Sequence, residues 1–363
     1  MLKLPPDHTA TTPLIMGHEI AGRIITSNNN YPALPPGTPV LIDPRLICST
    51  CPQCTAFSSS AAPDEDEDDS DNEPQSQGCA AGLSFVGFST AVKGGGFASR
   101  VAVKANAVHV LPEWKGKGKD GEKKKDLLAD AALVEPLAVA WHAVKRAGVL
   151  EVPGWVGGES GGKGERSKKG KKKKAAKDVA VLIVGGGPVG VAVAYVLRAW
   201  GVGTVVVSEP VAGRREHVRG LVDVVVDPVA ESVVEKCKEV TGGRGVDVVF
   251  ECAGSPRVVG DVFGSLAWRG VVVVVSLWVG EIPVPFPPLM YKESTLTSSC
   301  AYNEKDFAEV VKAFAEDRFE GVDRMITARI SLEDVVQKGF EELQKPDNTH
   351  LKILVTPKPL KIT

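Results

Sequence analysis

One stretch constrains the fold of this chain more than any other: an apolar run at 179–184, a glycine-rich turn, and a second apolar run at 191–200. The first run is rich in β-branched residues and predicts a strand buried on both faces, and the second is long enough for a helix. Gly185, Gly187 and Gly190 lie between them as G-x-G-x-x-G. Glycines at these positions allow a tight turn, close approach of a pyrophosphate and close packing of helix on strand. The unit therefore predicts a dinucleotide-binding α/β sheet, with the phosphates at the helix N-terminus.

A further cofactor contact is expected after the next strand, 204–208. Glu209 ends that strand nineteen residues after Gly190, where a carboxylate binds the adenosine ribose hydroxyls. An acid there repels a 2′-phosphate and favours NAD over NADP, a preference that nearby arginines weaken without reversing. The alternative is that Glu209 is a solvated loop charge. The expected cofactor-binding residues are Gly185, Gly187, Pro188, Val189, Gly190, Glu209 and Arg214.

Strand-like and helix-like runs alternate beyond Glu209, as a doubly wound sheet requires. The expected strands are 221–226, 246–251 and 271–276, and the expected helices are 231–240 and 257–268. The proline-rich segment 283–288 is expected to be an extended segment at the sheet edge. Near the C-terminus, Asn303 is expected to cap a helix over 304–316, and Ser331 to begin a capping box for a helix through 343, before a last strand at 351–355.

The first half of the chain contains two candidate metal sites. His18 and Glu19 lie between apolar runs with glycines at both flanks, and both side chains reach one metal ion if the backbone bends there; a buried core histidine is the alternative. Cys48, Cys51 and Cys54 have two-residue gaps that let thiolates converge on one tetrahedral ion, with Cys79 as the candidate fourth ligand. This pattern predicts a structural zinc, with reduced thiols or a redox role as alternatives.

Several motifs in fixed order resemble those of a known family. Four motifs precede the dinucleotide motif in this order: Gly17-His18-Glu19-x2-Gly22, the closely spaced cysteines, the Gly94–Ala98 segment, and the segment from Val134 through Glu135-Pro136 to His142. Together they resemble the zinc-dependent medium-chain alcohol dehydrogenases, and most closely the fungal members of the butanediol dehydrogenase and sorbitol dehydrogenase branch. The resemblance runs from about residue 12 to 357 and is interrupted by three inserts.

The resemblance implies an α/β protein of two domains. A GroES-like, mainly-β catalytic domain would comprise 1–143 and 300–363, and a Rossmann NAD-binding domain 144–299. His18, Glu19 and Glu135 would bind a catalytic zinc, and Cys48, Cys51, Cys54 and Cys79 a structural one. The implied reaction is reversible hydride transfer between NAD and a secondary alcohol, vicinal diol or polyol, in a homodimer or homotetramer. Without the resemblance, the alternative is that Glu135 caps a helix before Pro136.

One departure from the family pattern bears on activity. The family has a cysteine ligand of the catalytic zinc upstream of Gly-His-Glu, whereas the sixteen residues before Gly17 contain no cysteine. The expectation is either an N-terminally truncated enzyme with an incomplete catalytic domain, or a natural form without full zinc chemistry. A non-catalytic NAD-binding protein with a structural zinc is therefore the alternative function.

Charge and composition limit the partners. The acidic insert 58–77 and the lysine-rich inserts 113–125 and 154–177 are expected to be disordered, and the formal net charge is only −2. Neither nucleic acid nor membrane is expected as a partner, because the lysines lack interleaved aromatic residues and no long apolar run occurs. The N-terminus lacks the apolar core of a signal peptide, which predicts a cytoplasmic protein.

Overall fold

The computed structural model describes residues 14–27, 34–48, 51, 84–88, 94–115, 127–150, 174–278, 280–281, 283–345 and 348–357. The expected insert 58–77 lies outside this set, as do 116–125 and 154–173 of the two lysine-rich inserts. Residues 174–177 are described and contradict the expected extent of the third insert. Lys174 forms a bridge with Leu150 and an ion pair with Asp247, so ordered chain begins before 178.

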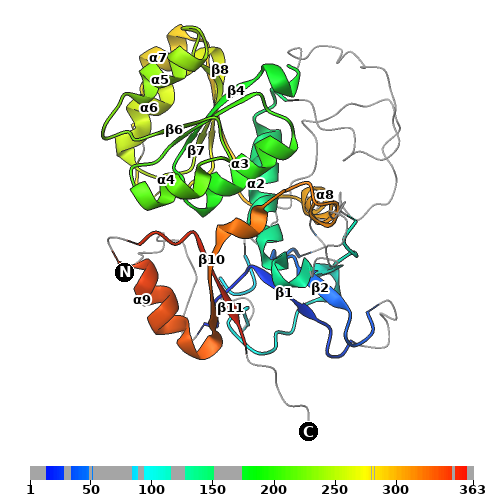
Figure 1. Ribbon diagram of the computed structural model, residues 1–363. Coiled ribbons are helices and arrows are strands. Elements are labelled where there is room, and N and C mark those ends of the chain that lie inside the picture. The colour runs from blue at the N-terminus through cyan, green and yellow to red at the C-terminus, as the bar shows by residue number, and fades with distance from the viewer. Residues whose placement is uncertain are drawn as a thin grey trace, which may run out of the picture.

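A six-stranded parallel sheet forms one half of the molecule (Figure 1). Its strand order is β6-β5-β4-β7-β8-β9. The strands are β4 (Ala180–Val184), β5 (Thr204–Ser208), β6 (Val224–Val226), β7 (Val246–Glu251), β8 (Leu266–Val274) and β9 (Thr295–Ser298). The chain moves outward from β4 in both directions, so a crevice opens between the carboxyl ends of β4 and β7.

Both faces of this sheet are covered by helices. Alternate residues of β4 belong to different cores: Val181 and Ile183 pack with α2 (Val134–Arg146) and α3 (Pro188–Ala199), whereas Ala180, Leu182 and Val184 pack on the opposite side. That opposite core includes residues of two short helices. The remaining helices of this half are α4 (Ala212–Val218), α5 (Val233–Val240), α6 (Val259–Gly264) and α7 (Phe286–Tyr291). The doubly wound arrangement is thus confirmed, and continuous apolar strands are its cause.

Three expected elements in this half are corrected. The strand expected over 221–226 begins only at Val224. The helix expected over 257–268 ends at Gly264, because β8 already begins at Leu266 and pairs with β7. The expected extended segment 283–288 turns into α7 at Phe286, where prolines occupy the first turn and need no N–H partner there.

The other half is mainly β (Figure 1). An antiparallel sheet contains β1 (Ile20–Arg23), β2 (Pro39–Ile42) and β3 (Val108–Val110), and a separate parallel pair contains β10 (Ile326–Ser331) and β11 (Lys352–Thr356). Two helices, α2 and α8 (Glu304–Ala315), join it to the large sheet and share its core. Buried ion pairs hold the two helices together, with His142 Nδ1 2.6 Å and Lys145 Nζ 2.8 Å from the Asp306 carboxylate.

The two capping predictions have opposite outcomes. Asn303 accepts from the Asp306 N–H and the Asp306 carboxylate returns a bond to the Asn303 N–H, so the predicted cap of α8 is confirmed as a capping box. Ser331 is not a helix cap, since its hydroxyl bonds the Asp334 carboxylate instead. The expected helix up to 343 is a 3₁₀ turn, a π-helix over Val335–Phe340 and the short α9 (Glu341–Leu343). None of the helices in the described ranges is both long and apolar enough to cross a membrane.

Candidate metal and dinucleotide sites

The glycine-rich turn after β4 has the geometry that its sequence requires. Gly185 has φ +103°, a backbone conformation that favours glycine. A Cβ at Gly190 would lie 1.9 Å from the Gly185 carbonyl oxygen, so only glycine allows α3 to start this close to the strand. Gly187 faces open space instead, with no heavy atom within 4 Å of the position of a Cβ. Pro188 begins α3, and the turn thus leaves room for a phosphate at the N-terminus of a twelve-residue helix.

Glu209 lies beside this turn and is only 3% exposed, which contradicts the alternative of a solvated loop charge. Its carboxylate accepts hydrogen bonds from the N–H groups of Gly186 and Val211, each at 2.8 Å. Arg215 supports the same segment by donating to the Glu209 carbonyl and pairing with Asp227. Arg214 is half-buried, and its Nε has no partner among the described residues. Each carboxylate oxygen of Glu209 keeps a second lone pair for a ribose hydroxyl.

His18 and Glu19 lie at the start of β1, in a segment held by close backbone contacts. Gly17 has φ +99°, and its carbonyl accepts from the Gly96 N–H at 2.7 Å. A Cβ on Gly87 would approach that carbonyl oxygen to 2.0 Å, so glycines let two loops pack directly on this segment. The His18 ring packs against Phe88, with centroids 5.9 Å apart. The backbone thus bends at Gly17 and fixes both side chains on one side of the sheet.

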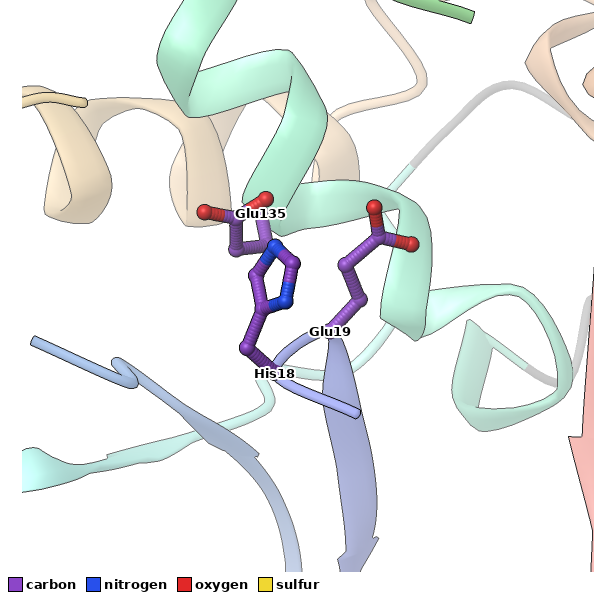
Figure 2. Close-up of side chains that lie close together, drawn as sticks. All are labelled: His18, Glu19 and Glu135. Carbon is purple, nitrogen blue, oxygen red and sulfur yellow. The ribbon is translucent and has the colours of Figure 1, made fainter. Parts of the chain in front are cut away.

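Glu135 reaches the same place from the first turn of α2, as Figure 2 shows. Ligand atoms of His18, Glu19 and Glu135 all lie within 4.8 Å of one another. Glu135 is 6% exposed, and the N-cap residue Leu133 makes no side-chain cap hydrogen bond. Glu135 therefore faces this cluster and does not cap α2. Two carboxylates and one imidazole from distant parts of the chain converge on one point.

The electrostatics of the cluster suit a divalent cation. Burial raises the pKa of Glu135 to about 8, and the negative charge of Glu19 adds to the effect. Burial lowers the pKa of His18, so its imidazole is neutral and available as a ligand. A mixed nitrogen and oxygen donor set of three protein ligands fits zinc with an open fourth position, whereas Mg²⁺ and Ca²⁺ prefer oxygen alone. The residues present thus fit a catalytic zinc.

Lys352 contributes to the cluster although its sequence context gave no indication of it. Its Nζ lies 2.5 Å from Glu19 Oε1, and 333 residues separate the two in sequence. A wide cleft of about 1870 Å³ opens here, lined in part by His18, Glu19 and Lys352. Lys352 begins β11, which pairs with β10, and this pairing helps to place its side chain at the metal cluster. Its ammonium partly neutralises the two carboxylates.

The second predicted metal site is described only in part. The Cys51 N–H donates to Cys48 Sγ at 3.3 Å, so these two cysteines lie side by side. Cys54 and Cys79 lie outside the described residues. The four-cysteine site therefore stays a prediction.

Comparison with known proteins agrees with this architecture. Residues 3–113 match the alcohol dehydrogenase GroES-like domain, and residues 188–316 match the zinc-binding dehydrogenase family. The chain is 30% identical to (R,R)-butanediol dehydrogenase of Saccharomyces cerevisiae, over 96% of this chain and 81% of the yeast protein. It is 28% identical to the enzyme of that name from Neisseria gonorrhoeae, over 96% of this chain and 82% of the relative.

A solved structure extends the likeness to three dimensions. The crystal structure of 2R,3R-butanediol dehydrogenase from Bacillus subtilis superposes with a TM-score of 0.73 at 26% identity, covering 99% of this chain and 86% of the other. The predicted combination of a GroES-like domain and a Rossmann-type parallel sheet is confirmed. The chain belongs to the zinc-binding alcohol dehydrogenase family of oxidoreductases.

Proposed function

We propose that this protein is a zinc-dependent dehydrogenase that transfers a hydride between NAD and a secondary alcohol, preferably a vicinal diol of the 2,3-butanediol type or a polyol. The observation that carries the proposal is the convergence of His18, Glu19 and Glu135 within 4.8 Å beside an open cleft. The names of the relatives from Saccharomyces cerevisiae and Neisseria gonorrhoeae support the diol as substrate.

The side chains at the cluster have separable tasks. Bound zinc would supply a Lewis acid that lowers the pKa of the alcohol hydroxyl. His18 offers a neutral nitrogen, because burial lowers its pKa, and its contact with Phe88 limits water on one side. Glu19 and Glu135 supply negative charge, and Lys352 orients the Glu19 carboxylate by its ion pair. Through the metal, these residues would position the alcohol oxygen, so that the hydroxyl proton leaves to water and the carbon that bears the oxygen can give a hydride to NAD.

The glycine-rich turn would hold the dinucleotide. Gly185, Gly187, Pro188, Val189 and Gly190 form the binding loop, and NAD bound there would accept the hydride. Glu209 would bind the adenosine ribose through its remaining lone pairs and so disfavour a 2′-phosphate, with Arg214 as a neighbouring contact. Cys48, Cys51, Cys54 and Cys79 would hold a structural zinc. We further propose a cytoplasmic homodimer or homotetramer.

A second candidate has one observation in its favour. The Lys352 ammonium already lies against both oxygens of Glu19, where it competes with a metal ion for the same carboxylate. If the ammonium prevails, the chain would bind NAD and a structural zinc without turning over an alcohol.

The first experiment distinguishes the two candidates. Purified protein with added zinc should reduce NAD when 2,3-butanediol or sorbitol is supplied, and a chelator should abolish that activity. Glu135→Gln should lower kcat/KM at least about 100-fold, since the second carboxylate at the metal is lost. The matched control is Glu216→Gln, because Glu216 is an exposed glutamate that pairs with Arg219 at the end of the same helix. Tight NADH binding without turnover of any secondary alcohol would exclude the dehydrogenase and favour the second candidate.

A further inference from the structure

Tyr302 lies where the chain returns from the large sheet to the mainly-β half, between β9 and α8. Its side chain is 0% exposed, and its ring stacks on Phe307 with centroids 5.4 Å apart and an interplanar angle of 29°. The preceding Ala301 has φ +53°, so the backbone turns sharply just before this residue. The packing and the backbone conformation together hold the Tyr302 ring in one orientation.

A buried arginine holds Tyr302 from the other side. The Arg45 guanidinium lies 4.7 Å from the centre of the Tyr302 ring, and its Nη1 donates to the Tyr302 carbonyl at 2.5 Å. The remaining nitrogens are bound by the Asp43 carboxylate, with Nε 3.0 Å from Oδ1. Arg45 is 7% and Asp43 6% exposed, so the two charges compensate each other in the interior. A charged pair of this kind fixes the ring far more firmly than apolar packing alone.

The hydroxyl of Tyr302 is the part that this packing does not explain. It is buried and has no partner of regular hydrogen-bond geometry among the described residues. It interacts with the Glu135 side chain: burial raises the pKa of Tyr302 well above its usual value, and the neighbouring Glu135 carboxyl adds to that shift. Buried hydroxyls nearly always have a partner, because a hydroxyl that leaves water without one loses its hydrogen bonds. Glu135 can supply that partner, since a carboxylate that binds a metal through one oxygen still accepts a hydrogen bond on the other.

We propose that Tyr302 is a positioning residue of the metal site: its hydroxyl donates to the Glu135 oxygen that does not bind the metal, and Arg45 with Asp43 holds the ring in place for that bond. The inference rests on the proposed function, because it assigns Glu135 as a zinc ligand. Ligands of metals in proteins are commonly oriented by such outer hydrogen bonds, whose loss lowers metal affinity about 10- to 100-fold. Tyr302 touches neither substrate nor cofactor in this arrangement.

Tyr302→Phe tests the inference, because it removes only the hydroxyl and leaves the ring packing intact. Zinc affinity is measured by competition with a chelator, and the site is identified as the zinc that His18→Ala loses. The variant should bind that zinc about 10-fold or more weakly, and the visible spectrum of the cobalt-substituted protein should change. The control is Tyr195→Phe, which removes another partly buried tyrosine hydroxyl, one that donates to the Gly321 carbonyl at 2.6 Å and is not part of the metal cluster. It should leave both readouts unchanged.

The outcomes separate the two proposals. If Tyr302→Phe and the wild-type protein have the same zinc affinity and the same cobalt spectrum, Tyr302 is an ordinary core residue and the inference is wrong while the proposed function stands. If the wild-type protein and His18→Ala bind zinc equally, no zinc depends on the cluster and both proposals fail. Thermal unfolding of the metal-free variants checks that an affinity loss does not come from a damaged fold.

Discussion

At the scale of single residues, the Glu135 carboxyl departs far from the chemistry of the free amino acid. Its pKa rises to about 8 because it is buried, with the charge of Glu19 as the second cause. In the unfolded chain the pKa of this carboxyl is about 4.3. Between these values the folded, metal-free protein holds a proton that the unfolded chain releases. Ionising this side chain without a metal is therefore unfavourable, and a bound cation reverses that penalty.

A pH dependence follows from this shift. Because the pKa is raised in the folded state, the contribution of this group to stability is fully present below the pKa that it has in the unfolded chain. That contribution is lost as the pH rises through the pKa of the folded protein. The metal-free protein should therefore lose stability between about pH 5 and pH 8, with Glu135 contributing at most about 1.4 kcal/mol per pH unit. Glu135→Gln should remove that contribution. Urea unfolding of chelator-treated protein at several pH values measures the slope, and equal slopes in both proteins would contradict the prediction.

The sequence predicts some residues of the site and not others. His18, Glu19 and Glu135 could be predicted because each stands in a short local pattern that the family shares. Lys352 and Tyr302 could not be predicted, because strand pairing or packing with residues hundreds of positions away brings them to the cluster. Glu209 follows β5 directly, as the strand pattern indicated, but the two backbone bonds to its carboxylate depend on the folded loop.

At the scale of secondary structure elements, those defined by local chemistry were predicted best. Strands β5 and β7 have the predicted limits, and the Asn303 cap of α8 is present, since strand propensity and capping act over a few residues. The errors occur where a distant partner decides. Strand β8 begins at Leu266 and pairs with β7, although a helix was expected up to residue 268. The segment after Ser331 carries a capping pattern, yet its hydroxyl bonds a side chain and the helix becomes irregular.

The junction of β4 and α3 gives a prediction at this scale. Gly190→Ala places a methyl carbon 1.9 Å from the Gly185 carbonyl oxygen, so the turn must open. We expect the affinity for NADH, measured by fluorescence titration, to fall at least about tenfold. The free energy of unfolding should fall by about 1–3 kcal/mol. Gly260→Ala in α6 is the control, because nothing lies within 4 Å of the added carbon and alanine favours a helix. Unchanged NADH binding in Gly190→Ala would exclude this turn as the cofactor site.

At the scale of the whole molecule, large apolar side chains are exposed near one edge of the large sheet. Leu277, Phe286, Met290 and Tyr291 are each more than half exposed, and they lie on α7 or just after β8. The neighbouring β9 is the last strand of the sheet as described. Exposed apolar groups gathered in this way mark a protein–protein contact in many folds. We expect the proposed homo-oligomer to form through this surface.

Phe286→Asp tests this interface, since a charge at its centre opposes association. Analytical ultracentrifugation should show the wild-type protein as a dimer or tetramer and the variant shifted to smaller species. Val229→Asp is the matched control, because Val229 is 83% exposed and follows β6 at the opposite edge of the sheet. A monomeric wild-type protein, or an oligomer that Phe286→Asp leaves intact, would contradict the prediction.

Helix α2 carries Glu135 at its first turn and packs along its length against both α3 and α8. A division of the chain at 143/144 would cut this helix shortly before its end at Arg146. An excised nucleotide-binding unit made at that point would lose the apolar cover of α3 and aggregate. Chimaeric proteins that exchange the cofactor domain between relatives should therefore be joined before Val134. Every such exchange will also transfer Glu135, a carboxylate of the metal site, together with the cofactor domain.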